Sequence, residues 1–271
     1  MPDTVETHYN LSSTADILLT SEKGDRLASK KNVNFENGKA NENVIHVQPD
    51  VIKQTLHGIG TSFTEASAFV LAHLSNSKRQ EVMSRIYSEQ GADFSLARTV
   101  IGASDFSVDG NFSYDDVQDD TALKHFSIAP DLDGFSKKKY PGIQDEQFDL
   151  LPMIKQALAI KQQQHDSDLK IIASAWTAPA WMKDIEDWYI PGGEENDLHG
   201  TGGVLKKGYE KYYANYLIMY LEHYKNQGVN IWGITPVNEP NGNNGQWESM
   251  HFSAESQNDF IKHHLGPALH H

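Results

Sequence analysis

Cysteine is absent from the 271 residues of this chain. Disulfides, zinc–thiolate sites and cysteine nucleophiles are therefore excluded. Basic residues are also in short supply, because 23 Lys and Arg stand against 37 Asp and Glu, and the formal charge is −14. So acidic a chain is a poor partner for nucleic acid or for an anionic membrane surface. All apolar runs fall well short of the roughly 18 residues that a transmembrane helix needs, so no membrane span is predicted.

The usual signals for a leader, a cofactor or a metal are missing as well. The start, MPDTVETHYN, lacks a basic n-region and an apolar h-region, so no signal peptide is visible and the location of the protein stays open. The stretch GTGGVLKKG lacks the G-K-[ST] ending of a phosphate-binding loop. The acidic stretch DFSVDGNFSYDDVQDD does not fit the calcium-loop pattern, and a solvated loop is the favoured interpretation. No cofactor and no metal site are expected.

What the chain does contain is an alternation of strand-like and helix-like segments. Short edge strands are expected before residue 42, and further strands are predicted at 44–48, 51–59, 94–102, 169–176 and 230–238. Helices are predicted at 64–75, 78–89, 148–164, 209–228 and 253–267. This rhythm, with the longer loops after the strands, favours an α/β fold with a parallel sheet, as in a (β/α)8 TIM barrel, of which about four βα units are present.

Two of the predicted helices carry more detailed expectations. On the helix 209–228, Tyr213, Leu217, Tyr220 and Tyr224 recur every three or four residues and predict one buried face. The last helix is expected to begin after Ser253 as its N-cap and to stop at residues 266–267, a Gly-Pro pair.

Polar side chains and one tryptophan follow the ends of the predicted strands. Arg98 lies in one strand and Asp105 just beyond it, Trp176 ends the next strand, and Asn238 and Glu239 end the one after that. In a parallel sheet these ends meet at one edge, which then carries an aromatic ring, an amide and two carboxylates. Such a set suits a sugar, because a pyranose stacks on indole and its hydroxyls bind amides and carboxylates. A carboxyl at this edge can also serve as a general acid.

Each residue by itself also has a plainer interpretation. Glu239 fits a turn or the first turn of a helix, Trp176 fits the core, and Asp105 fits a cap. Their common position after three successive strands is what favours a binding site.

Five stretches carry a family resemblance: HGIGTSFTEASAF, SLARTVIGASDFS, IIASAWTAPAWMK, WGITPVNEP and FSAESQNDFIKHHLGPAL. In this order they resemble glycoside hydrolase family 30, and are most similar to its glucosylceramidase-like and β-1,6-glucanase-like branches. The resemblance implies a retaining β-glycosidase whose barrel is fused to a small β-sandwich, and it suggests a secreted or periplasmic location. It divides the chain into a sandwich segment, residues 1–57, and the first half of the catalytic barrel, residues 58–271.

The same resemblance assigns roles to single residues. Glu239 matches the family's general acid/base, and Asn238 matches the asparagine that contacts the sugar 2-hydroxyl. Asp105 matches an aspartate that binds glucose hydroxyls, and Trp176 a tryptophan that lines the same subsite. Arg98 matches an arginine that supports the region of the acid/base and the nucleophile.

Two parts of the family pattern are altered or missing. Trp247 would line the aglycone side, although the loop around it departs from the glucosylceramidase pattern. The family's nucleophile is a glutamate after the seventh strand, and no glutamate here matches its motif. The implied function is hydrolysis of β-glucosides, such as glucosylceramide or β-1,6-glucan, by double displacement, with β-1,6-glucanase, xylanase and β-xylosidase activities left open. The alternative is a non-catalytic half-barrel that at most binds carbohydrate, with a missing C-terminal half or a second copy as its partner.

Overall fold

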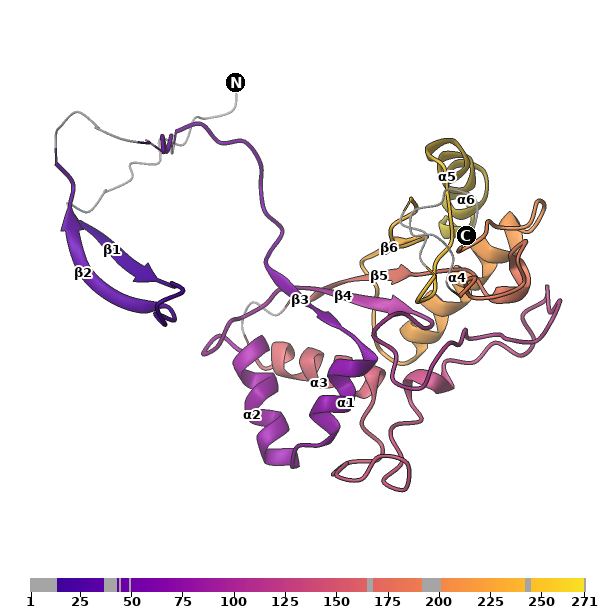
Figure 1. The fold of residues 1–271 in the computed structure, drawn as a ribbon, viewed down its shortest axis with the longest axis horizontal. Helices are drawn as coiled ribbons and strands as arrows, with labels where there is room; N and C mark the ends of the chain where they lie inside the picture. The colour runs from indigo at the N-terminus through magenta and orange to yellow at the C-terminus, as the bar shows by residue number, and fades with distance from the viewer. Residues whose placement is uncertain are drawn as a thin grey trace. The chain divides into compact units, whose positions relative to one another are not determined.

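The computed structural model describes residues 14–36, 43, 45–48, 50–164, 168–191, 201–241 and 245–270. The chain forms two compact units, Met1–Gln54 and Thr55–His271 (Figure 1). Among the described residues, no helix combines the length and the apolar character that crossing a membrane requires.

The first unit contains an antiparallel hairpin. Its strands are β1 (Thr14–Leu19) and β2 (Ala28–Asn34), as the expectation of short edge strands predicted. Gly24 turns the chain with a φ of 100°, a conformation that suits glycine. Apolar side chains of both strands are exposed, among them Leu18 and Val33.

The second unit contains a parallel sheet of four strands in sequential order. They are β3 (Gly60–Phe63), β4 (Leu96–Ile101), β5 (Lys170–Ala175) and β6 (Gly233–Thr235). Every neighbouring pair is parallel, and helical segments join them, which confirms the predicted βα rhythm. Four strands are half the number of a (β/α)8 barrel, and the parallel sheet identifies the fold class as predicted.

The helices α1, α2, α3 and α5 begin after residues whose side chains cap them. Thr64, Ser75, Asp149 and Ser253 each accept a hydrogen bond from a backbone N–H of the first turn that follows. The elements are α1 (Glu65–Ala72), α2 (Asn76–Tyr87), η1 (Ala129–Asp131), α3 (Leu150–Gln162), η2 (Ala180–Met182), α4 (Glu210–Asn226), α5 (Ala254–Phe260), the π-helical turn η3 (Ile261–Leu265) and α6 (Gly266–Leu269).

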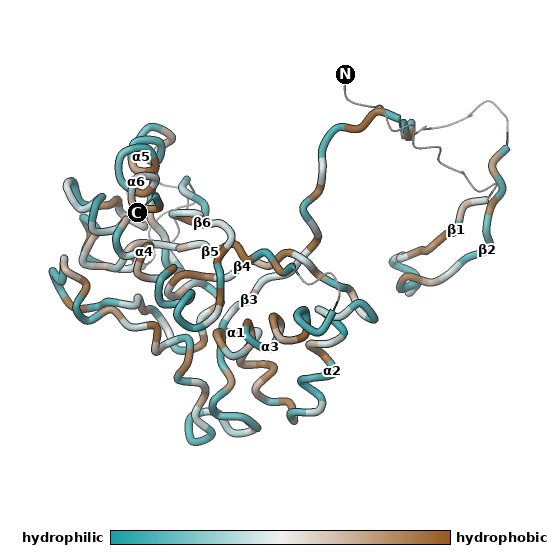
Figure 2. The backbone as a smooth tube through the Cα atoms, turned by 180° about the vertical axis from the view of Figure 1, so that it is seen from behind, coloured by the Kyte–Doolittle hydropathy of each residue, from teal (hydrophilic) through white to brown (hydrophobic). Residues whose placement is uncertain are grey.

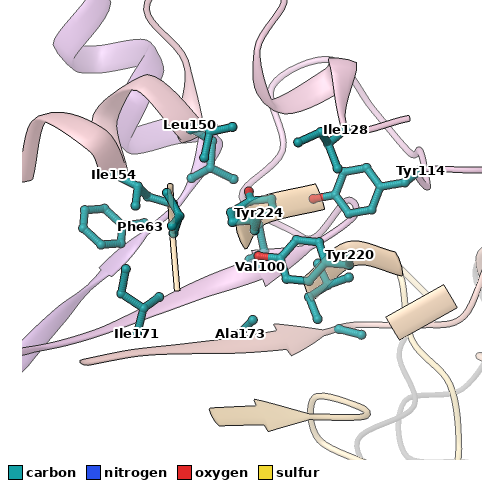
Figure 3. Packing of buried hydrophobic residues seen from close by; sticks show 14 of the residues in the cluster. Phe63, Val100, Tyr114, Ile128, Leu150, Ile154, Ile171, Ala173, Tyr220 and Tyr224 are labelled. Atoms are coloured by element: carbon teal, nitrogen blue, oxygen red, sulfur yellow. The ribbon is translucent and has the colours of Figure 1, made fainter. Parts of the chain in front are cut away.

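The core lies between the sheet and the helices that cover one of its faces. Figure 1 shows α1, α2 and α3 on the same side of β3 and β4. Phe63, Ile171 and Ala173 of the strands pack there with side chains from α3 and α4 (Figure 3). The tube of α2 and α3 in Figure 2 alternates between teal and brown, as expected for helices with one apolar face. On α4, the predicted face is confirmed, because its four residues are fully buried: Tyr213, Leu217, Tyr220 and Tyr224.

Two predicted strands are wrong. Residues 45–48 and 51–59 are irregular and mostly exposed, with residue 44 outside the described part, and the first barrel strand starts at Gly60 instead. Apolar composition favours a strand, but a strand also needs a partner, and only Gly60–Phe63 pairs with β4. The backbone of Leu96 approaches Gly60 so closely that a Cβ there would clash with it, so this pairing requires glycine.

Two predicted boundaries are also wrong. The strand predicted at 230–238 is reduced to β6, and at its C-terminal end Pro236 has no N–H for the ladder after Thr235. The last helix does not stop at Gly266 but continues through Leu269. Pro267 is tolerated because it lies in the first turn of α6, after the π-helical turn η3, where a missing N–H costs little.

Candidate active site

The residues predicted from the strand ends come together at one edge of the sheet. The register places Ile101 beside Ala175 and Ser174 beside Thr235, so β4, β5 and β6 end at the same level. Asp105 follows β4, and Trp176 follows β5 directly. Asn238 and Glu239 follow β6, and the N–H of Asn238 donates to the carbonyl of Ala175 at 2.6 Å. That hydrogen bond extends the pairing of β5 and β6 up to the predicted acid/base.

Arg98 is the centre of this edge. Its Nε donates to Ser174 Oγ at 2.9 Å, and its Nη2 donates to Asn238 Oδ1 at 2.6 Å. Its guanidinium carbon lies 4.7 Å from the ring centroid of Trp176, within cation–π range. One side chain therefore links β4, β5 and the residue that precedes Glu239.

The negative charges of both predicted carboxylates act on the pKa of Arg98, so both carboxylates lie near it. Burial lowers the pKa of the Arg98 guanidinium, and the negative charges of Glu239 and Asp105 oppose that shift. Both carboxylates belong to exposed residues, while Arg98 is half-buried. A positive charge thus lies within electrostatic reach of two solvent-accessible carboxylates, and such a charge favours their ionised forms.

Glu239 has an unusual backbone. Its φ is 46°, in the left-handed region that non-glycine residues rarely adopt and that costs of order 1–3 kcal/mol. The neighbours hold it there: Asn238 is bonded to Ala175, and the carbonyl of Pro240 accepts from the N–H of Phe252 at 3.2 Å. Strained residues of this kind concentrate at functional sites, where the surrounding structure determines their conformation.

The loop that carries Asp105 is tied to α1. Ala66 N–H donates to the carbonyl of Phe106 at 3.0 Å, and Val108 N–H donates to Glu65 Oε2 at 2.7 Å. Burial raises the pKa of Glu65 to about 7, and the hydrogen bond from Val108 opposes this. The sequence provided no motif for this role of Glu65, although an acidic residue directly after the cap Thr64 is typical of a helix start.

The two predicted tryptophans differ in their surroundings. Trp176 is 6% exposed and belongs to the core cluster. Most of its surface is therefore buried, as its plainer interpretation as a core residue predicts. It also lines a cavity of about 730 Å³ together with Arg98, Phe106, β3 and α1. Trp247 is half-buried and packs against the core from the loop after β6.

The structure adds three residues that the patterns did not assign to the site. Ser174 is fully buried and joins Arg98 to Thr235, whose Oγ1 donates to Ser174 Oγ at 2.7 Å. Glu248 is 2% exposed, and its Oε1 has no hydrogen-bond partner among the described residues. Burial raises the pKa of Glu248, Asp105 raises it further, and Lys183 opposes the shift. A serine within an apolar strand, as in IIASAW, was the only sequence signal for any of them.

A parallel βα sheet that gathers an arginine, an amide and two exposed carboxylates at the carboxyl ends of its strands has the architecture of a (β/α)8 barrel enzyme. The chain belongs to glycosyl hydrolase family 30, since the model of that family's TIM-barrel domain matches residues 56–271.

Individual relatives agree with this assignment. The chain is 32% identical over 220 residues to endo-1,6-beta-D-glucanase neg1 of Aspergillus fumigatus, covering 80% of this chain and 41% of that one. It is 28% identical over 229 residues to the lysosomal acid glucosylceramidase of Mus musculus, covering 83% and 39%. The crystal structure of SrfJ from Salmonella typhimurium superposes with a TM-score of 0.71 at 27% identity, covering 90% of this chain and 47% of that chain. The chain thus spans less than half the length of each of these relatives.

Proposed function

We propose that these residues form the acid/base half of a retaining β-glycosidase that acts on β-glucosides. The observation that carries the proposal is the position of Arg98, bonded to Asn238 and within electrostatic reach of both Glu239 and Asp105. Glu239 protonates the leaving oxygen and then activates water, Asn238 contacts the sugar 2-hydroxyl, and Asp105 binds glucose hydroxyls. Trp176 supports the same subsite, and Trp247 lines the aglycone side.

The second carboxylate of the double displacement is supplied from outside residues 1–271. Retaining glycosidases need two carboxyl groups about 5–5.5 Å apart. The glutamates that lie near the site, Glu65 and Glu248, are buried or bonded to backbone and carry no nucleophile motif. A nucleophile on the far side of a completed barrel would face Glu239 across the sugar. In this proposal the hairpin of β1 and β2 belongs to a β-sandwich segment, residues 1–57.

The proposed substrates are glucosylceramide-like glycolipids and β-1,6-glucans. The printed names of relatives support both, since one is a glucosylceramidase and another an endo-1,6-β-glucanase. The exposed position of Glu239 and Asp105 suits a glucosyl unit that enters from solvent. An aglycone would extend toward the loop that carries Trp247.

The stereochemistry of the product tests the mechanism. The complete polypeptide is incubated with 4-nitrophenyl β-D-glucopyranoside and with a β-1,6-glucan, and the first sugar released is followed by proton NMR. We expect the β-anomer first, because two displacements restore the starting configuration. The α-anomer as the first product would contradict the proposal.

A second function, carbohydrate binding without hydrolysis, follows if the native polypeptide ends at residue 271. In that case the partner would be a second copy or a separate C-terminal half. Intact mass of the native protein separates the two functions, and a mass near 30.4 kDa together with sugar binding but no hydrolysis would favour the binding function.

A further inference from the structure

Lys183 is a buried lysine whose ammonium group donates three hydrogen bonds. It follows η2 in the loop after β5, and its side chain is 0% exposed. Its Nζ donates to the carbonyl oxygens of Trp188 at 2.7 Å, Gly202 at 3.0 Å and Ser249 at 3.0 Å. An ammonium group has three hydrogens, so each donor has a carbonyl acceptor.

These three carbonyls belong to two different loops. Trp188 and Gly202 lie 5 and 19 residues further along, in the loop after β5, whereas Ser249 lies 66 residues further along, in the loop after β6. Two backbone contacts cross between the loops beside them. Ser249 N–H donates to the carbonyl of Trp188 at 3.5 Å, and His251 N–H donates to the carbonyl of Gly203 at 2.8 Å. Lys183 therefore lies where the two loops meet.

The loop after β6 returns from this junction to the residue that follows Glu239. The carbonyl of Pro240 accepts from the N–H of Phe252 at 3.2 Å and contacts His251 Nδ1 at 2.9 Å. A carbonyl can only accept, so Nδ1 carries the hydrogen in this contact. The chain from Ser249 to Phe252 thus connects the ammonium of Lys183 with the backbone next to Glu239.

The charge of this ammonium group is disfavoured by its burial. Burial lowers the pKa of Lys183 to about 7, while Asp187, Asp184 and Glu248 oppose that shift. A desolvated charge is costly, and an apolar side chain of the same length would avoid that cost but would leave the three carbonyl oxygens without this donor. Only a donor with several hydrogens can join three carbonyls from two loops.

We propose that Lys183 is a positioning residue, which holds the loop after β6 so that Pro240 keeps Glu239 in its left-handed conformation. The inference rests on the proposed acid/base role of Glu239. Lys183 itself contacts backbone carbonyls and takes no part in bond breaking.

The test compares two substrates with the same glucosyl group in the complete polypeptide. One is 4-nitrophenyl β-D-glucopyranoside, whose leaving group departs with little protonation, and the other is a β-1,6-glucan, whose leaving oxygen depends on the acid. We expect Lys183→Met to lower kcat/KM for the glucan by roughly tenfold or more beyond its effect on the aryl glucoside. This ratio does not depend on the fraction of folded enzyme, so a purely structural role would leave it unchanged.

Two further variants make the comparison decisive. Lys206→Met is the matched control, because Lys206 Nζ donates to the carbonyl of Trp181 at 3.0 Å and to Glu186, all within the loop after β5, and its ratio should stay that of the wild type. His251→Phe removes the Nδ1 contact with Pro240 at the other end of the connection, and we expect it to shift the ratio in the same direction as Lys183→Met. If Lys183→Met does not fold, the substrate ratio is measured in His251→Phe, because the half-buried His251 is the less disruptive position to change.

Hydrogen–deuterium exchange separates failure of this inference from failure of the proposed function. The amides of residues 249–252 should exchange faster in Lys183→Met than in the wild type or in Lys206→Met. Unchanged exchange there, or an unchanged substrate ratio in both Lys183→Met and His251→Phe, would overturn the positioning role. If the wild type hydrolyses neither substrate, the glycosidase proposal fails, and the exchange measurement still decides whether Lys183 orders the loop.

Discussion

The two faces of the parallel sheet differ in burial and in polarity. On the face toward the helices, Phe63, Ile171 and Ala173 are buried and pack against α3 and α4 (Figure 3). On the opposite face, where side chains alternate with these, Arg98 and Ile172 are half-buried and Ser62 is exposed. Among the described residues, helices of the same chain cover the first face. The second carries the polar groups of the candidate site.

The difference shows that one face of the sheet contributes mainly to the stability of the fold, while the other holds the residues of the candidate site. Burial of apolar side chains stabilises the helix-covered face without any directional requirement. On the other face, Arg98, Ser174 and Asn238 are held by hydrogen bonds, which fix direction as well as distance. A site needs that directional control, so we expect mutations on the two faces to affect different measurements.

Glu239→Gln should have the largest effect of all, and it should be confined to activity. Without an acid, turnover of substrates with basic leaving groups should fall by roughly 10²–10⁴-fold, with far less loss on activated aryl glucosides. Steady-state kinetics of the complete polypeptide on both substrate types would measure this. Equal losses on the two would argue against the acid/base role.

Ile171→Ala and Ile172→Ala form a matched pair of neighbours on opposite faces. Ile171 is 0% exposed, so its truncation should lower the free energy of unfolding by about 2–5 kcal/mol through a cavity. Ile172 is half-buried, and its truncation should cost clearly less. Urea unfolding followed by far-UV circular dichroism gives both values, and similar costs would mean that the second face is as well packed as the first.

Arg98→Lys should separate charge from geometry on the polar face. A lysine keeps the positive charge near Glu239 and Asp105 but cannot bond Ser174 and Asn238 with the same planar fork. We expect kcat/KM to fall by roughly 10- to 100-fold, because a small misplacement of reacting groups has effects of that size. Wild-type activity in this variant would show that charge alone is sufficient.

Asp131→Asn should have the smallest effect, on the pH dependence of stability. This carboxyl is a polar exception in the core, where Tyr114 and Tyr224 donate to its Oδ2 at 2.7 and 2.5 Å. Burial raises the pKa of Asp131 from its ordinary value of 3.8 to about 7, and the two tyrosine hydrogen bonds oppose the shift. Between these values the folded state binds more protons than the unfolded state, so stability falls as pH rises.

An asparagine can still accept both tyrosine hydrogen bonds but does not titrate. The decline in unfolding free energy from pH 4 to pH 7 should therefore become shallower in Asp131→Asn. It should not vanish, since burial also raises the pKa of Glu65 to about 7. Urea unfolding at several pH values would measure the slope, and an unchanged slope would contradict the assignment to Asp131.

Local patterns predicted the elements that depend on nearby residues. The buried tyrosine face of α4 follows from a spacing of three and four, and the cap Ser253 follows from its side-chain chemistry. The same reasoning failed at residues 51–59, where apolar composition was present but a neighbouring strand was not. It also failed at residues 266–267, because a π-helical turn lets the helix accommodate a proline.

The order of strands and helices along the chain predicts which residues can meet, since strand ends after parallel βα units lie at one edge whatever their contacts. The contacts that these residues make depend on the folded chain. Arg98 reaches Asn238 across 140 residues, and Lys183 reaches Ser249 across 66. Such contacts depend on strand register and on the paths of long loops, which no spacing of three or four residues encodes. The left-handed backbone of Glu239 has the same origin: its own side chain disfavours it, and the hydrogen bonds of its neighbours hold it in place.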